Sequence, residues 1–78
     1  MLHVTVARTI IGRLLEAREL ERPITLSESS RRWGKLATWR DLIQRGFIDR
    51  SSPHAITVTD EGLSWFRSSG STKEETTH

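Results

Sequence analysis

The chain has 78 residues, with 12 Lys and Arg against 10 Asp and Glu, 35% hydrophobic residues and no Cys. This describes one small domain without disulfides, thiolate metal ligands or a cysteine nucleophile. The longest apolar runs are two residues, such as Ile10 and Ile11, against the roughly 20 that a bilayer span requires. We therefore expect a soluble, cytoplasmic protein that contacts no membrane.

Positive charge is concentrated in the middle of the sequence. Residues 31–50 contain six basic and two acidic side chains, a net charge of +4, whereas the whole chain carries +2. Five of the six are Arg, whose planar guanidinium suits phosphate groups and guanine edges. A solvated face with unrelated charges would explain the same cluster.

The first predicted element is an amphipathic helix over residues 5–20, with Thr5 as its N-cap. Its apolar residues recur with the helical period, and they cover an arc wider than the ~100° that one core contact needs. Surplus apolar surface marks an interface. We therefore predict a homodimer through this helix, with Ile11 and Leu15 as the interface residues.

A second helix is predicted to start at Leu26. Thr25 and Glu28 have the T-x-x-E spacing of a capping box, in which each side chain satisfies a backbone N–H of the first turn. This helix is short, because Gly34 offers the chain a turn.

The third predicted helix covers residues 35–45 and ends at Gly46, the expected left-handed residue. Its apolar residues are expected to face the core: Leu36, Trp39, Leu42 and Ile43.

From residue 47 the sequence pattern changes from that of a helix to that of β-strands. Residues 47–50 and 55–58 are rich in β-formers, and the four residues between them have turn composition. Thr59 is placed to cap a last short helix over residues 60–66. Residues 67–78 contain no large apolar side chain, so a disordered tail is expected after a domain at residues 1–66.

This element order and two local strings carry a resemblance to a known group. Residues 42–50 read L-I-Q-R-G-F-I-D-R and residues 56–62 read I-T-V-T-D-E-G. Together with residues 24–28 they resemble small prokaryotic and phage winged-helix regulators, the MarR and PadR types among them. The three strings lie between residues 24 and 62. It implies an α+β winged helix-turn-helix, with a three-helix core, a two-stranded β-hairpin wing and a short C-terminal helix.

The resemblance implies binding of double-stranded DNA without a cofactor, as a sequence-specific transcriptional regulator such as a repressor. In this fold the third helix enters the major groove and the wing follows the backbone. Arg40 is the candidate for a guanine edge and Gln44 for an adenine edge. The remaining candidate contacts to phosphate or base are Arg31, Arg32, Lys35, Thr38, Arg45, Arg50 and His54. Asp41 is expected to pair with Arg45 within the helix.

Other functions are weighed against DNA binding. A winged-helix module for protein–protein interaction, or an accessory subunit that binds no DNA, would use the apolar face of the first helix. The three Trp residues are expected to belong to the core and not to stack on bases. The three His residues lack metal spacing, and no arrangement predicts a small-molecule substrate, so we expect no enzymatic activity.

Overall fold

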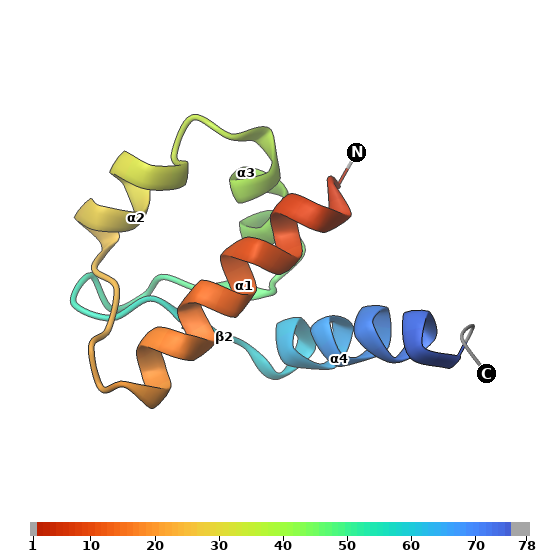
Figure 1. Cartoon of the computed structure of the whole chain (residues 1–78). Coiled ribbons are helices and arrows are strands. Elements are labelled where there is room, and N and C mark those ends of the chain that lie inside the picture. Colours follow the sequence, from red (N-terminus) through yellow and green to blue (C-terminus); the bar gives the residue numbers. More distant parts are fainter. Residues whose placement is uncertain (1, 76–78) are drawn as a thin grey trace.

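The structure, a computed structural model, describes the backbone of residues 2–75 and the side chains of residues 2–69. Within these residues the chain is α+β, with four helices and one antiparallel hairpin (Figure 1). The elements in chain order are α1 (Val4–Glu19), α2 (Leu26–Trp33), α3 (Ala37–Gln44), β1 (Ile48–Asp49), β2 (Thr57–Val58) and α4 (Asp60–Glu75). This order and hairpin are compatible with a small winged-helix fold.

Helix α1 is the centre of the core. It packs against α3, α4 and β2, and its buried residues are Ala7, Ile10, Ile11 and Leu14. Ile11 is fully buried, so its assignment to a dimer interface is wrong. The wide apolar arc of α1 is covered within the chain, because other elements approach this helix from more than one side. Leu15 is half-buried and packs against the same core.

Two helices start where local signals place them, and two do not. Helix α2 begins at Leu26, and the hydroxyl of Thr25 accepts from the N–H of Glu28 at 3.1 Å, as predicted. The second bond of the capping box is not formed, because the carboxylate of Glu28 lies beside Arg32. Helix α4 begins at Asp60 after Thr59, also as predicted. Helix α1 begins one residue earlier than expected, and His3 replaces Thr5 as its cap.

Helix α3 begins at Ala37, two residues later than predicted. The preceding residues form a turn in which the N–H of Leu36 donates to the carbonyl of Trp33 at 2.9 Å. Leu36 therefore lies before the helix and outside its apolar face, and it is 40% exposed, contrary to the expectation that it faces the core. Thr38 is buried instead, because it lies one turn before the buried Leu42 on the same face.

The hairpin is confirmed, with shorter strands than predicted. Ile48 pairs with Val58 and Asp49 with Thr57. Gly46 has a φ of 76°, the left-handed conformation expected at the end of α3. Backbone bonds also fasten the hairpin to the chain before α2, since the N–H of Ile56 donates to the carbonyl of Ile24 at 2.9 Å.

Thr59 joins the start of α4 to the turn after α3. Its hydroxyl donates to the carbonyl of Gly46 at 2.5 Å and accepts from the N–H of Gly62 at 3.1 Å. Its own N–H donates to the carbonyl of Phe47 at 3.0 Å. A Cβ at Gly62 would collide with that same Phe47 carbonyl. The T-x-x-G spacing therefore serves a close approach of α4 to the hairpin.

Helix α4 is longer than the short helix predicted to end at Phe66. It continues to Glu75, so residues 67–75 are helical where disorder was expected. Arg8 of α1 supports its middle, since the guanidinium donates to the carbonyl of Phe66 at 2.7 Å and to the hydroxyl of Ser69 at 2.5 Å. The last part of the predicted tail, residues 76–78, lies outside the described residues.

Candidate nucleic-acid interface

A groove lies between the exposed face of α3, the end of α2 and the residue that follows β1 in the hairpin. Its lining residues are Ser30, Gly34, Trp39, Arg40, Ile43, Gln44 and Arg50. Arg40, Gln44 and Arg50 are exposed, whereas Trp39 is buried and Ile43 half-buried. The groove thus combines two cationic side chains and one amide with an apolar side formed by Trp39 and Ile43. All three polar residues were predicted from the sequence as DNA contacts.

The spacing on α3 places Arg40 and Gln44 together. They are four residues apart, one turn of the helix, and therefore share a face. The opposite face is fixed by burial of Thr38, Trp39 and Leu42. Because the core contacts determine the rotation of α3, the two polar side chains are directed outward by packing and not by contacts of their own.

Arg50 reaches the groove through the turn after α3. Gly46 reverses the chain, and β1 follows with Ile48 buried and Asp49 exposed. Phe47 anchors the start of this strand by stacking on Trp65 of α4, with ring centroids 5.6 Å apart and an interplanar angle of 26°. Arg50 follows this strand directly, so its position is held by the buried Ile48 and the stacked Phe47 before it.

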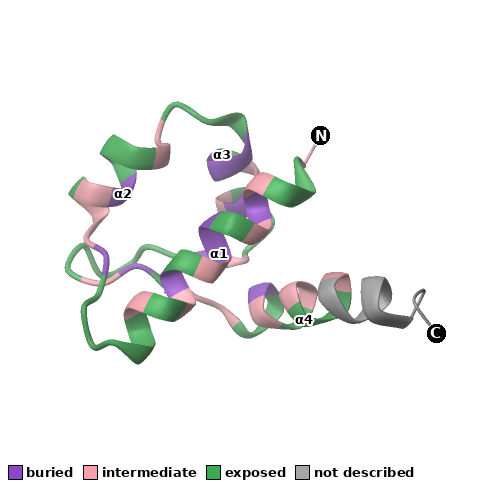
Figure 2. Cartoon of the chain, in the orientation of Figure 1, coloured by how far each residue is buried: buried purple, intermediate pink, exposed green. Residues whose placement is uncertain are grey.

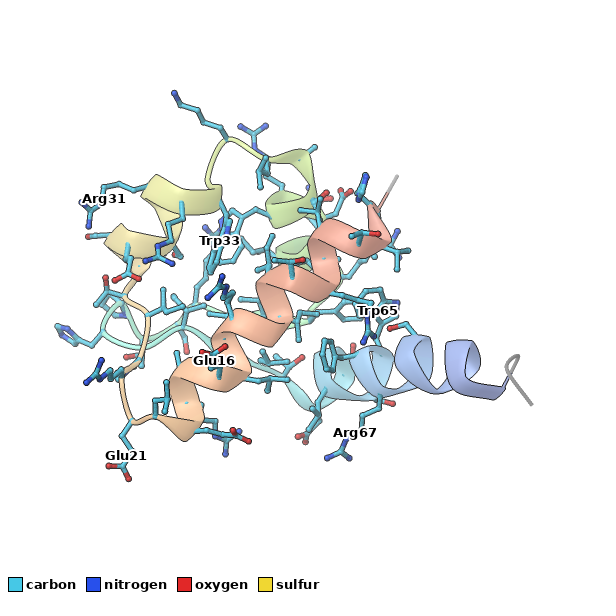
Figure 3. The ribbon with its side chains drawn as sticks, in the orientation of Figure 1. Glu16, Glu21, Arg31, Trp33, Trp65 and Arg67 are labelled. Atoms are coloured by element: carbon cyan, nitrogen blue, oxygen red, sulfur yellow. The ribbon has the colours of Figure 1, made fainter. Side chains whose placement is uncertain are left out.

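Three other predicted contacts lie on α2 or in the turn after it, and none of them lines the groove. Arg31 and Arg32 are exposed and border a separate shallow hollow with Glu28. Arg31 points away from the body of the molecule (Figure 3). Arg32 lies 3.5 Å from the carboxylate of Glu28, one turn earlier. Lys35 is exposed in the turn between α2 and α3.

Three further predicted site residues have different surroundings. Thr38 is 7% exposed, so it is not available as a DNA contact. Arg45 is exposed at the C-cap of α3, and His54 is exposed in the hairpin turn. The expected Asp41–Arg45 pair is not formed, since the one ion pair among residues 2–69 joins Arg32 and Glu28. Arg45 is therefore free of an acidic partner in the described part of the chain.

The Trp residues belong to the core and its border, as predicted. Trp39 is 4% exposed, and Trp33 and Trp65 are half-buried against the core. Trp33 contacts Trp39 with ring centroids 5.6 Å apart, which links α2 to α3. Figure 3 shows Trp33 directed toward the interior beneath α2.

Sequence reasoning missed two features of this surface. Ser30 and Gly34 border the groove, but neither carries a charge or a pattern that marks it. A second hollow lies on another part of the molecule, between the C-terminal half of α1 and β2. It is lined by Leu14, Leu15, Arg18, Glu21, Pro23, Ala55, Ile56, Thr57 and Val58.

Asp49, beside Arg50, has a perturbed pKa. The backbone N–H of Ser51 donates to its carboxylate at 2.8 Å, and this bond, with a further one from the Ser51 hydroxyl, lowers the pKa of Asp49. Slight desolvation opposes the shift. The carboxylate therefore stays charged at neutral pH and shapes the hairpin turn.

Within the described residues, no three His, Asp or Glu side chains come together as metal ligands. No helix in that part of the chain has the length and apolar character of a membrane span. Comparison of the chain with family models, curated proteins and solved structures finds no match.

Proposed function

We propose that the chain is a small winged helix-turn-helix protein that binds double-stranded DNA with sequence preference and acts as a cytoplasmic transcriptional regulator. The observation that carries the proposal is the groove that brings Arg40 and Gln44 of α3 together with Arg50, the residue after β1. These residues lie 10 or fewer positions apart in the sequence, yet they come from two elements whose orientations are fixed separately by the core.

Helix α3 is the element proposed to enter the major groove. That groove is about 12 Å wide and admits one helix. Arg can bond bidentately to the O6 and N7 of guanine, and Gln to the N6 and N7 of adenine. Arg40 and Gln44, one turn apart on the exposed face, are the residues with that chemistry.

The surrounding cations are proposed to hold the DNA backbone. Arg50 and His54 belong to the hairpin. Arg31 lies on α2, Lys35 lies in the turn before α3, and Arg45 is at the C-cap of α3. Phosphate contacts fix the position of a protein on the duplex without reading its sequence. Arg32 contributes less in this proposal, because Glu28 already lies 3.5 Å from its guanidinium.

The proposal is tested by fluorescence anisotropy with a random-sequence duplex at two or more salt concentrations. Each phosphate neutralised gives a slope of about −0.9 in log K against log salt. We expect a slope of about −2.7 to −4.5, corresponding to three to five such contacts. Absence of binding at low salt, or a slope near zero, contradicts the proposal.

A second candidate function is protein–protein interaction without DNA, including a role as an accessory subunit. The hollow between α1 and β2 favours it, because Leu15 and Val58 are only half-buried there and Arg18 and Glu21 border them. The homodimer stays a prediction, and in this structure it would use Leu15 and not Ile11. Sedimentation at micromolar concentration distinguishes a dimer from a mass of 8.9 kDa.

A further inference from the structure

Helix α3 differs from the other three helices in how it begins. A side chain caps each of the others: the Nδ1 of His3 for α1, the Thr25 hydroxyl for α2 and the Thr59 hydroxyl for α4. Leu36 stands at the N-cap of α3 and makes no such bond. The first N–H groups of α3 therefore lack the side-chain acceptor that the chain provides at every other helix start in the described residues.

Leucine at this position is unfavourable for local folding. It is among the poorest N-cap residues, whereas Ser, Thr, Asp and Asn are preferred. Leu36 is also 40% exposed, so packing in the core accounts for only part of its side chain. A residue that breaks a local rule without an evident gain in packing is expected at a functional surface.

The neighbours of Leu36 indicate what the side chain meets. Lys35 and Ala37 on either side are exposed, and Arg40 follows one turn later in the groove. Leu36 and Ala37 are thus exposed apolar residues that lie in the sequence between two exposed cations, Lys35 and Arg40. The cations select a polyanion, and the apolar group that duplex DNA presents in its major groove is the 5-methyl of thymine.

We propose that Leu36, assisted by Ala37, contacts the 5-methyl group of a thymine and makes the protein prefer thymine at that position. This inference rests on the proposed DNA binding and adds a specificity residue to it. Arg40 and Gln44 would read neighbouring bases by hydrogen bonds, while Leu36 reads a base by shape and apolar contact.

The test uses duplexes selected by the wild-type protein from a random library. Each thymidine is then replaced in turn by deoxyuridine, which lacks only the 5-methyl group. At one or two positions we expect wild-type affinity to fall about fourfold, the factor that burial of one methyl group gives. Leu36→Ala should bind both versions equally. Leu20→Ala is the matched control, since Leu20 is 60% exposed at the C-cap of α1, and it should keep the discrimination.

A second variant separates this role from folding. Leu36→Ser supplies the missing cap, so it should melt about 4–8 °C above Leu36→Ala while lacking the discrimination between thymine and uracil. If wild type tolerates deoxyuridine everywhere, or Leu36→Ala keeps the discrimination, the inference is overturned while salt-dependent binding still supports the proposed function. If wild type binds no duplex at all, both are overturned.

Discussion

The junction of α4 with the hairpin and the helix α2 are held in place by different means. At the junction, Thr59 makes four hydrogen bonds to the turn and helix around it, Gly62 lies against the backbone of Phe47, and Phe47 stacks on Trp65. Helix α2 buries only Ser29 completely, and Figure 2 shows most of its surface as exposed or intermediate. One region is fixed by tertiary contacts, whereas the other depends on its own caps and a few links.

This difference bears on the proposed function. The groove takes Arg40 and Gln44 from the well-packed α3, but Ser30 comes from α2 and Gly34 from its C-cap. Elements with few buried contacts open at lower free energy than the global unfolding of a protein. We therefore expect the rigid side of the groove to set which bases are contacted, and α2 to adjust to the DNA backbone.

The largest expected effect is at the junction. Gly62→Ala places a methyl group against the Phe47 carbonyl, so it should lower the free energy of unfolding by about 1–3 kcal/mol. Urea denaturation measures this. Gly12→Ala is the matched control, because nothing lies within 4 Å of a Cβ there. It should raise stability by up to about 1 kcal/mol through helix propensity. Equal effects of the two substitutions would contradict the close approach of α4.

A smaller effect is expected at α2. Thr25→Ala removes the hydroxyl that accepts from Glu28 and should cost about 0.5–2 kcal/mol. Amide hydrogen exchange should show the loss of protection concentrated in α2. Thr5→Ala serves as the control, since His3 and not Thr5 caps α1, and exchange in α1 should not become faster. Loss of protection spread evenly over all helices would mean that α2 is as firmly integrated as the junction.

The smallest effect concerns the hairpin turn at Asp49. Its pKa is lowered in the folded state, so the charged carboxylate stabilises folding above the ordinary aspartate pKa of about 3.9, and this stabilisation is lost as the pH falls through the lowered value. Asp49→Asn should therefore melt slightly below wild type at pH 6, and the gap should close as the pH falls through the lowered pKa of Asp49. A gap that persists at low pH would assign the effect to side-chain geometry.

Local sequence signals predicted the parts of the fold that local bonds determine. The cap at Thr25, the left-handed Gly46 and the capping bond of Thr59 to Gly62 each involve residues a few positions apart, and the structure has them in the expected roles. The signals failed where distant segments decide. The burial of Ile11 requires knowledge of which elements cover α1, and the length of α4 depends in part on Arg8, which lies 58 residues before Phe66.

The candidate site was predictable to a similar degree. Residue type and helical spacing identified Arg40, Gln44 and Arg50, which the structure brings to one groove. Thr38 was misassigned because the turn before α3 delays the helix start, and helix boundaries are the least reliable feature of a sequence pattern. The grouping of Arg31 and Arg32 away from the groove could not be inferred without the orientation of α2.

The exposed face of α3 is proposed to read the DNA sequence. Comparison of Arg40→Ala, Arg50→Ala and Arg13→Ala on a selected duplex and a random one tests this role of α3. Arg40→Ala should cost about 1–3 kcal/mol on the selected duplex and much less on the random one, whereas Arg50→Ala should weaken both alike. Arg13, exposed on α1, should have little effect on either. If Arg40→Ala weakens both duplexes equally, or no more than Arg13→Ala, α3 is not the element that reads the sequence.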